Sequence, residues 1–182
     1  MPQNPDDLLF AESVREELVT TLDNHGLHKN PVSIDEMLAG LGTEDVGDQY
    51  PRDLSIGQRQ RVALGAVTVT HPPVVLLDEP TRGLDGSAKK RLVHIMKAWL
   101  AKGVSVLLVT HDVELANMIA DRVIIMADGE IIADGDARSV LGASPQFAPQ
   151  IARLFPNRGW LTVEDALQNL PSLDEMEETC PD

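Results

Sequence analysis

The sequence has only one cysteine and no long apolar run. Cys180 lies among acidic residues near the end of the 182-residue chain, so it cannot form an intramolecular disulfide and has no neighbouring metal ligand. No stretch approaches the roughly 18 consecutive apolar residues of a membrane-spanning helix, and residues 1–9 carry neither a basic leader nor an apolar signal core. We therefore expect a cytoplasmic protein, unless another component holds it at a membrane.

Positive charge is also scarce. The chain has 15 lysines and arginines against 29 aspartates and glutamates, which gives a formal net charge of −14. Clusters of basic residues are nearly absent, so the surface is not built to follow a phosphate backbone and nucleic acid is not an expected partner. Much of the acidity lies in residues 174–182, which we expect to form a solvated end of the chain.

Apolar and helical patterns alternate in the middle of the chain. An apolar run at residues 74–77 precedes a helical pattern at residues 92–100, and a second apolar run follows at residues 104–109. This order is typical of a βαβ unit with parallel strands. Residues 113–120 fit a further helix. The sequence therefore predicts the α/β class, with a mainly parallel sheet.

The rest of the chain is predicted to be helical, apart from one hairpin at residues 123–133. Helical patterns fill residues 1–70, and short helical segments punctuated by proline and glycine follow residue 135. We expect a helical lobe, an α/β half-core and a small C-terminal helical extension, with these bounds: 1–71, 72–135 and 136–182.

Two adjacent carboxylates end the first apolar run. Asp78 and Glu79 directly follow residues 74–77, and charged groups at the end of a buried strand are costly unless they have a task. The carboxyl ends of parallel strands are where open α/β sheets bind ligands. Successive side chains on a strand point opposite ways, so one acid could hold a hydrated Mg²⁺ while the other orients or deprotonates a water. A structural ion pair is the alternative interpretation.

A second candidate feature is Ser55 and Gly57, directly before the helical pattern at residues 59–70. A hydroxyl, a glycine that admits close approach of the backbone, and the positive end of a helix dipole together suit a bound phosphate. Ser55 and Gln58 also have capping-box spacing, so an ordinary N-cap is the alternative interpretation. The segment at residues 80–85, directly after Asp78 and Glu79, bears on the choice between a phosphate site and an ordinary N-cap at Ser55.

His111 follows the second apolar run, one strand along from Asp78 and Glu79. A histidine at this end of the strand is placed to reach a terminal phosphate and the water that attacks it. A single histidine is more often structural, so its interpretation depends on the features around it.

Taken in order, residues 54–58, residues 74–79, residues 83–85 and His111 resemble the motifs of ATP-binding-cassette ATPases. Four motifs in that family's order are far more specific than any one of them. The resemblance implies a P-loop NTPase-like ABC ATPase core, incomplete here, that binds and hydrolyses ATP with Mg²⁺, together with a helical signature subdomain. One departure is Ile56, where the family often has glycine, and we expect it to matter little.

The resemblance also implies a role for each motif. Glu79 is the implied catalytic carboxylate, His111 the switch histidine, and Gln3 the Q-loop glutamine that reaches the metal and the attacking water. Asp78 is the implied Walker B acid, which holds Mg²⁺ partly through water. The implied signature residues, which would bind nucleotide in trans, are Leu54, Ser55, Ile56, Gly57 and Gln58. The implied D-loop residues at the dimer interface are Gly83, Leu84 and Asp85.

A narrower resemblance is to the energy-coupling-factor subgroup, which serves vitamin and cobalt or nickel uptake. Residues 2–14, 78–85 and 158–163 carry this resemblance. It implies an ATPase subunit that powers membrane import and lies peripherally at the cytoplasmic face of the cell membrane. The implied partners are a second ATPase subunit, in a head-to-tail dimer, and a transmembrane transporter component.

The chain lacks the G-x-x-x-x-G-K-[S/T] loop that cradles phosphates. In the family this Walker A loop precedes the Q-loop, so a chain that opens two residues before Gln3 is expected to be truncated and inactive alone. Losing three charge-assisted hydrogen bonds at about 1.5–3 kcal/mol each would remove most of a micromolar affinity, which is worth about 8 kcal/mol. The strand that carries the loop should lie beside residues 74–77, so a long exposed apolar edge is expected there.

Three interpretations of the function remain open from the sequence. The chain could be half of an ATP-hydrolysing module, a non-catalytic module that supplies its signature motif to a nucleotide held by a complete partner, or a non-functional gene fragment. A DNA-repair or chromosome-structure ATPase would need a long coiled coil before the signature motif, and residues 43–53 are too short for one.

Overall fold

The computed structural model describes residues 1–27, 33–144 and 146–170. The chain divides into two compact units, Met1–His111 and Asp112–Asp182. The predicted boundaries after residues 71 and 135 stay predictions, because each falls inside one of these units. Cys180 and the predicted acidic end at residues 174–182 lie outside the described residues.

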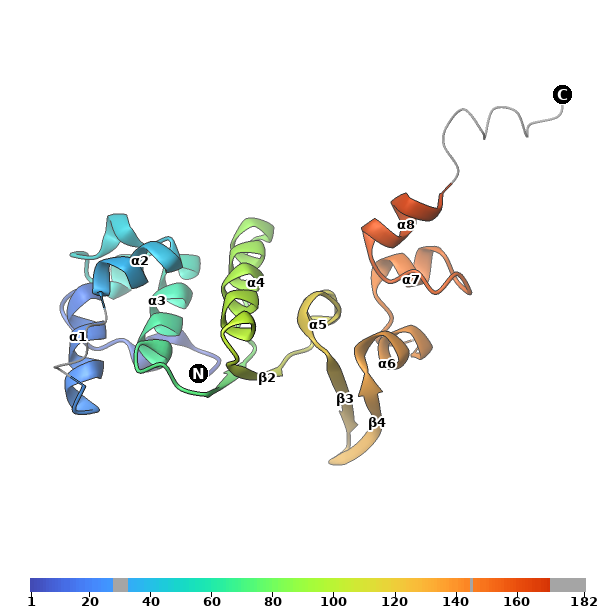
Figure 1. Ribbon diagram of the computed structural model, residues 1–182, viewed down its shortest axis with the longest axis horizontal. Helices are drawn as coiled ribbons and strands as arrows, with labels where there is room; N and C mark the ends of the chain where they lie inside the picture. Colours follow the sequence, from blue (N-terminus) through green and yellow to red (C-terminus); the bar gives the residue numbers. More distant parts are fainter. Residues whose placement is uncertain (28–32, 145, 171–182) are drawn as a thin grey trace, which may run out of the picture. The chain divides into compact units, whose positions relative to one another are not determined.

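Helices fill the first part of the first unit. The α-helices are α1 (Val14–Asn24), α2 (Ile34–Leu41) and α3 (Ile56–Thr68), and the short 3-10 helices are η1 (Pro5–Leu8), η2 (Glu44–Val46) and η3 (Pro51–Asp53). Both α1 and α2 pack on α3 (Figure 1), and η1 also lies against α3. The helical patterns predicted for residues 1–70 are therefore helices in the structure.

A serine precedes each of these three α-helices, and its side chain accepts a hydrogen bond from a first-turn backbone N–H. The serines and the residues that donate are Ser13 with Glu16, Ser33 with Glu36, and Ser55 with Gln58. A short polar side chain at this position satisfies a donor that has no partner within the helix. The positions of the serines therefore determine where the helices begin.

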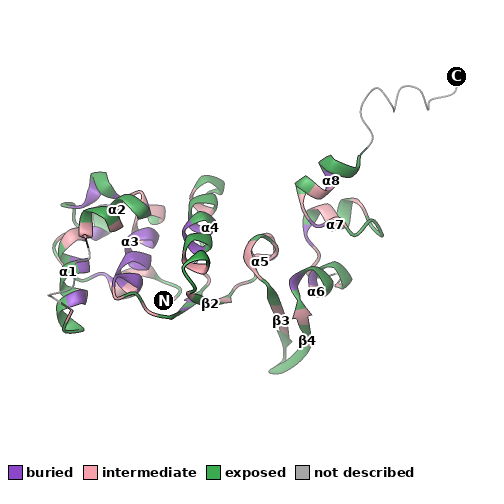
Figure 2. Ribbon diagram, viewed as in Figure 1, coloured by how far each residue is buried: buried purple, intermediate pink, exposed green. Residues whose placement is uncertain are grey.

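One cluster of buried apolar residues joins the three helices. Figure 2 shows buried segments of the ribbon in purple on α1, α2 and α3. Its members are Leu9, Val14, Leu18, Leu22, Leu38, Val46, Leu54, Val62, Ala63, Ala66 and Val69. The close approach of α2 to α3 depends on Gly65, because a Cβ atom there would lie 2.6 Å from Cδ1 of Leu41. The helical part of the first unit thus has a closed core of its own.

A βαβ unit follows the helices. It consists of β1 (Val74–Asp78), α4 (Gly86–Ala101) and β2 (Ser105–Val109), with the two strands parallel and Leu76 paired with Leu107. The predicted strands and their parallel order are confirmed. α4 begins earlier than the apolar spacing predicted, because Asp85 caps it and accepts a hydrogen bond from the Ala88 N–H at 2.8 Å.

One face of this sheet is buried and the other is exposed. Val75 and Leu77 of β1 are 4% and 1% exposed, so they face the covered side. The apolar side chains on the opposite face are all more than half exposed: Val74, Leu76, Leu107 and Val109. We call these four residues the open face.

The outer edge of β1 is paired with the start of the chain. The nitrogen of Met1 donates to the carbonyl oxygen of Leu76, and the carbonyl oxygen of Met1 accepts from the Asp78 N–H at 3.2 Å. β1 is the outer strand of a two-stranded sheet and Met1 covers only part of its edge, so the expected exposed apolar edge at residues 74–77 is confirmed in part. Side chains alternate along a strand, so the exposed apolar groups lie on a face, while the backbone of Met1 occupies part of the edge.

The second unit combines short helices with one hairpin. Its elements are α5 (Val113–Ile119), β3 (Arg122–Ala127), β4 (Glu130–Asp136), α6 (Ala137–Ala143), α7 (Gln150–Leu154) and α8 (Val163–Asn169). β3 and β4 pair antiparallel around Asp128 and Gly129, which both have positive φ, as a tight hairpin turn requires. The predicted hairpin is confirmed. None of the described helices in either unit is long and apolar enough to cross a membrane.

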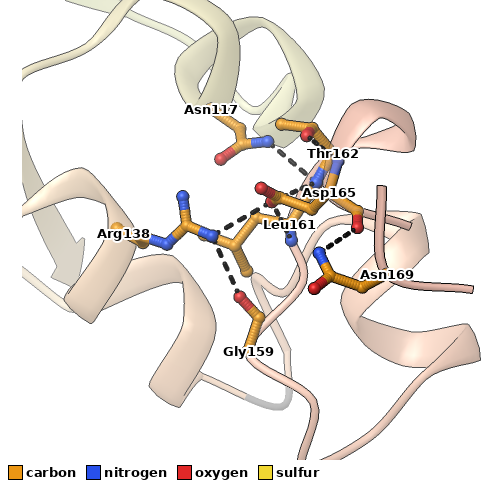
Figure 3. A network of polar contacts seen from close by, with 7 residues as sticks. All are labelled: Asn117, Arg138, Gly159, Leu161, Thr162, Asp165 and Asn169. Atoms are coloured by element: carbon orange, nitrogen blue, oxygen red, sulfur yellow. Dashed lines mark hydrogen bonds and ion pairs between the residues drawn. The ribbon is translucent and has the colours of Figure 1, made fainter. Parts of the chain in front are cut away.

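A polar network centred on Asp165 holds the helices of the second unit together (Figure 3). Its Oδ2 atom accepts from the N–H groups of Leu161 at 2.9 Å and Thr162 at 3.1 Å, and from Arg138 of α6 at 3.1 Å. The Leu161 N–H and the Arg138 guanidinium both stabilise the carboxylate, which lowers the pKa of Asp165 from 3.8 to about 2. Asn117 of α5 donates to the Leu161 carbonyl oxygen at 3.0 Å, so three helices meet at this network.

Candidate functional site

Glu79 lies just after β1, and the end of β2 holds its carboxylate. Its Oε1 atom accepts from the His111 N–H at 2.9 Å and lies 2.7 Å from His111 Nδ1, while Oε2 accepts from the Thr110 hydroxyl at 3.2 Å. The backbone N–H of Glu79 donates to the Val109 carbonyl oxygen at 2.9 Å. Glu79 has a φ of +46°, which is costly for a residue with a side chain and directs the carboxylate toward β2.

Glu79 and His111 differ sharply in exposure. The Glu79 side chain is 13% exposed, whereas the His111 side chain is 84% exposed. The carboxylate is therefore shielded and fixed, and the imidazole is free to contact a molecule that arrives from solution. The structure thus brings together two residues that lie 32 positions apart in the sequence.

Asp78 takes a different direction from Glu79. It is the last residue of β1 and is exposed, whereas the turn at Glu79 leads away from the strand. Glu79 is bound to Thr110 and pairs with His111 at 2.7 Å, which is a contact that the alternative interpretation, a structural ion pair, also expects. Both interpretations of the two acids therefore stay predictions.

Ser55, Gly57 and Gln58 form the start of α3. The Ser55 hydroxyl accepts from the Gln58 N–H at 3.3 Å and lies 2.8 Å from Gln58 Oε1, which also accepts from the Ser55 N–H at 3.1 Å. This complete capping box confirms the N-cap expected at Ser55. The N–H groups of Ile56 and Gly57 have no partner within the helix, so they remain available at its positive end.

A pocket of about 510 Å³ lies between the start of α3 and the start of α4. Residues from two predicted motif segments and four charged side chains line it: Gly42, Asp45, Ser55, Ile56, Gly57, Gln58, Arg61, Gly83, Leu84, Asp85, Ser87, Ala88 and Arg91. The two segments approach closely at Gly57, where a Cβ atom would lie 3.4 Å from the Ala88 Cβ and 3.8 Å from Leu84 Cδ2. The structure thus places the predicted signature and D-loop segments side by side. Leu54 lies outside this lining, because it is buried in the helical core.

Charge in this pocket is mixed. Burial, and secondarily the nearby Arg91, lowers the pKa of Arg61, whose guanidinium donates to the Gly42 carbonyl oxygen at 3.2 Å. The Ala88 N–H, and secondarily the Ser87 hydroxyl, lowers the pKa of Asp85. The pocket is therefore lined by side chains of both charges.

Gln3 lies close to the turn that follows Glu79. Its Oε1 atom accepts a hydrogen bond from Nη1 of Arg82 at 2.9 Å. Three residues further along, Asp6 of η1 accepts from Nη1 of Arg59 at 2.9 and 3.1 Å. The next residue of α3, the buried Gln60, donates to the Pro80 carbonyl oxygen at 2.9 Å. Three polar links therefore connect the predicted Q-loop, the turn after Glu79 and α3.

Sequence reasoning missed Arg59, Gln60 and Arg82. Their partners lie 53, 20 and 79 positions away, and no local pattern predicts contacts over such distances. The spacing of Ser55 and Gln58 predicted the start of α3. It did not predict the contacts of Arg59 and Gln60, the two residues that follow Gln58.

The residues at this edge fit a hydrated Mg²⁺ ion. Asp78 offers an exposed carboxylate and Gln3 an amide oxygen, which are the hard oxygen ligands that Mg²⁺ prefers. The described residues contain no group of three histidine, cysteine, aspartate or glutamate side chains that could hold a metal. An ion bound by one or two protein oxygens, water and phosphate needs no such group.

The sequence also matches known proteins. The model of the ABC transporter family matches residues 1–82. A protein of Streptomyces coelicolor, provisionally named an ABC transporter ATP-binding protein, is 45% identical over 93% of this chain and 30% of its own length. The energy-coupling factor transporter ATP-binding protein EcfA of Methanocaldococcus jannaschii is 37% identical over 76% of this chain and 50% of its own length.

Solved structures agree with these sequence matches. The cbiO1 protein of Clostridium perfringens, described as part of the ABC transporter complex cbiONQ, has a TM-score of 0.68 and 29% identity, covering 86% of this chain and 63% of its own. The ATP-binding cassette MJ0796, described as a dimer in a post-hydrolysis state bound to ADP and Pi, has a TM-score of 0.64 and 26% identity, covering 75% of this chain and 61% of its own.

The fold is therefore that of an ATP-binding-cassette ATPase domain, as the α/β pattern and the motif order predicted. The chain is similar to ABC transporter ATP-binding proteins, and the relatives that it matches include members of the energy-coupling subgroup. It spans about a third to a half of the length of the curated relatives reported above. The roles of individual residues in this chain stay predictions.

Proposed function

We propose that this chain supplies the catalytic carboxylate, the switch histidine and the signature segment of an ATP-hydrolysing transport module. The arrangement of Glu79 carries this proposal: a shielded carboxylate, fixed at the carboxyl end of a parallel strand, lies 2.7 Å from an exposed histidine on the neighbouring strand. This edge of a parallel sheet is where α/β folds bind ligands.

In the proposed reaction, Glu79 orients the attacking water and accepts its proton, since the carboxylate is already held by His111 and Thr110. His111 donates a hydrogen bond to the terminal phosphate, which its exposure permits. Asp78 and Gln3 would hold Mg²⁺, which neutralises charge on the phosphates when it is bound. The protein's contribution is mainly positioning and electrostatic stabilisation.

A second ATPase subunit would complete the site. The free N–H groups at the start of α3, the Ser55 hydroxyl and the pocket beside Asp85 suit a phosphate held by that subunit, in a head-to-tail dimer. MJ0796 is described as dimeric, and cbiO1 as part of a transporter complex. By the same analogy, the partners are a second ATPase subunit and a transmembrane component at the cytoplasmic face, and the cargo is a vitamin or metal ion.

A second candidate function has its own support. The signature pocket is formed without any contribution from Glu79 or His111. The chain could therefore act as a non-catalytic module that offers this pocket to a nucleotide bound by a complete partner.

The test mixes the chain with a segment of a family member that carries the G-x-x-x-x-G-K-[S/T] loop and measures hydrolysis of Mg·ATP. We expect hydrolysis in the mixture, and a loss of about 100-fold or more for Glu79→Gln, because the general base is removed. Glu130→Gln, at an exposed position of β4 outside the proposed site, is the matched control and should leave the rate unchanged.

The remaining outcomes separate the alternatives. Nucleotide binding in the mixture without hydrolysis, unaffected by Glu79→Gln, would favour the binding module. A mixture that neither binds nor hydrolyses ATP would contradict both proposals and favour a non-functional gene fragment.

A further inference from the structure

The side-chain oxygen of Gln3, which is proposed to reach Mg²⁺, is already occupied by a cation of this chain. Arg82 donates to it at 2.9 Å. We propose that Arg82 is a positioning residue that holds Gln3 away from the metal, so that Gln3 reaches Mg²⁺ only after Arg82 has released it. This inference rests on the proposed function and deepens it by naming what controls one metal ligand.

The position of Arg82 is tied to the catalytic carboxylate. Its backbone N–H donates to the Glu79 carbonyl oxygen at 3.1 Å, which closes the turn after β1. The same turn is held to α3 by Gln60, through the Pro80 carbonyl oxygen at 2.9 Å. A change in α3 or at Glu79 is therefore transmitted to the backbone that carries the Arg82 side chain.

The backbone around Gln3 is fixed on both sides. Before it, Met1 pairs with β1, and its carbonyl oxygen accepts from the Asp78 N–H. After it, Asn4 accepts from the Asp6 N–H at 3.3 Å, and the Asp6 carboxylate is bound by Arg59. Because these links hold the backbone, releasing Gln3 requires only a rotation of its side chain, which is fast and needs no unfolding.

The two states of Gln3 exclude each other. An amide oxygen bound to Mg²⁺ at about 2.1 Å would place the dication within a few ångström of the guanidinium that donates to the same oxygen. The repulsion between these cations disfavours the shared arrangement. Arg82 and Gln3 are both exposed, so the arginine can instead turn toward an anionic phosphate when nucleotide binds.

The first measurement tests the contact in the 182-residue chain without nucleotide. The side-chain amide resonances of Gln3 are identified by their loss in Gln3→Ala and then followed by NMR. We expect Arg82→Ala to shift them, Arg82→Lys to shift them less, and Lys90→Ala to leave them unchanged. Lys90 is an exposed cation of α4, and all three substitutions are at exposed positions where folding is not at risk. Unchanged Gln3 resonances in Arg82→Ala would overturn the proposal.

The second measurement tests control of the metal. In the mixture with the loop-bearing segment, Glu79→Gln and ATP, the affinity for Mn²⁺ is measured by electron paramagnetic resonance. We expect Arg82→Ala to tighten Mn²⁺ binding by about tenfold, a size typical of residues that orient metal ligands. The gain should vanish when Gln3→Ala is also present. Unchanged or weaker binding in Arg82→Ala would overturn the proposal.

The two measurements also separate the inference from the proposed function. If the mixture binds no nucleotide, the proposed function fails, and the NMR result on the chain alone still decides whether Arg82 holds Gln3.

Discussion

The helical core around α3 and the two-stranded sheet belong to the same compact unit, yet they differ in how completely they bury their apolar side chains. The helices close around eleven buried apolar residues, from Leu9 to Val69. The sheet covers one face and leaves Val74, Leu76, Leu107 and Val109 more than half exposed on the other. The helical part therefore buries its own apolar side chains, whereas the strands that lead to Glu79 and His111 leave the open face uncovered.

The second unit shows the same contrast. Its helices are tied by the Asp165 network, while the hairpin exposes Ile124, Met126, Ile131 and Ile132. Exposed apolar faces of this extent are typical of surfaces that bind another protein segment. In the first unit, the predicted catalytic residues Glu79 and His111 follow the strands that leave one face exposed, whereas the helices around α3 bury their apolar side chains.

The largest expected change is in the free energy of unfolding, and it is tested with one substitution in the helical core and one on the open face. Leu18→Ala should lower the free energy of unfolding by about 3 kcal/mol, because Leu18 is fully buried and its removal leaves a cavity against α3. Leu107→Ala, on the open face, should cost less than about 1 kcal/mol, since its side chain is already 57% exposed. Urea unfolding followed by circular dichroism measures both. Equal losses would contradict the contrast between the regions.

A buried carboxylate provides the next test of the helical core. Oε2 of Glu17 accepts from the N–H groups of Phe10 and Ala11 at 2.7 and 2.8 Å, and the residue is 6% exposed. Glu17→Ala should cost about 2 kcal/mol, because two donors lose a charged acceptor. Glu16→Ala, on the exposed side of the same helix, is the control and should cost at most about 0.5 kcal/mol. Similar costs for the two variants would show that Glu17 does not anchor this segment.

The Asp165 network sharpens the comparison in the second unit. The folded-state pKa of Asp165 is lowered to about 2 from 3.8, so its carboxylate stabilises the fold above pH 4. This stabilisation is lost as the pH falls toward 2. After allowance for solvent screening, Asp165→Asn should cost about 1 kcal/mol near neutral pH. The exposed neighbour Glu164→Gln is the control.

Urea unfolding at several pH values tests this prediction. The difference between the unaltered chain and Asp165→Asn should shrink steadily below pH 4. A difference that is the same at pH 2 and pH 7 would mean that the charge of Asp165 is not what stabilises the network.

The smallest expected effect has opposite signs for stability and binding. Gly57→Ala should raise the free energy of unfolding by about 0.5 kcal/mol, because alanine favours the helix and its Cβ would meet only ordinary contacts, the nearest at 3.4 Å. The same methyl group should weaken phosphate binding at the start of α3, where the backbone must approach closely. Thermal unfolding and nucleotide binding in the mixture measure the two effects. A gain in both would contradict a phosphate site there.

Local patterns predicted most of the secondary structure. The apolar runs became β1 and β2, and the spacing of Ser55 and Gln58 predicted a capping box that the structure shows in full. The start of α4 was placed too late, because the cap at Asp85 lies seven residues before Leu92, the first apolar position of the predicted helix. Patterns within a few residues of one another are sufficient where the physical interaction is itself local.

The candidate site was predictable in its members but not in its arrangement. The order of the motifs identified Glu79 and His111, but the positive φ of Glu79 and its bonds to the end of β2 depend on the turn and on tertiary pairing. The pairing of Met1 with β1 was not predicted, because it joins residues 75 positions apart in the sequence. The bond between Arg82 and Gln3 was missed for the same reason.

The most direct test of the central claim is calorimetric titration of Mg·ATP into the chain alone and then into its mixture with the loop-bearing segment. We predict no measurable binding to the chain alone, and binding in the mixture, because the open face and the edge at Glu79 are then completed by the segment that cradles the phosphates. Tight binding of Mg·ATP by the chain alone would contradict this account, because the phosphate site would then lie somewhere else in these 182 residues.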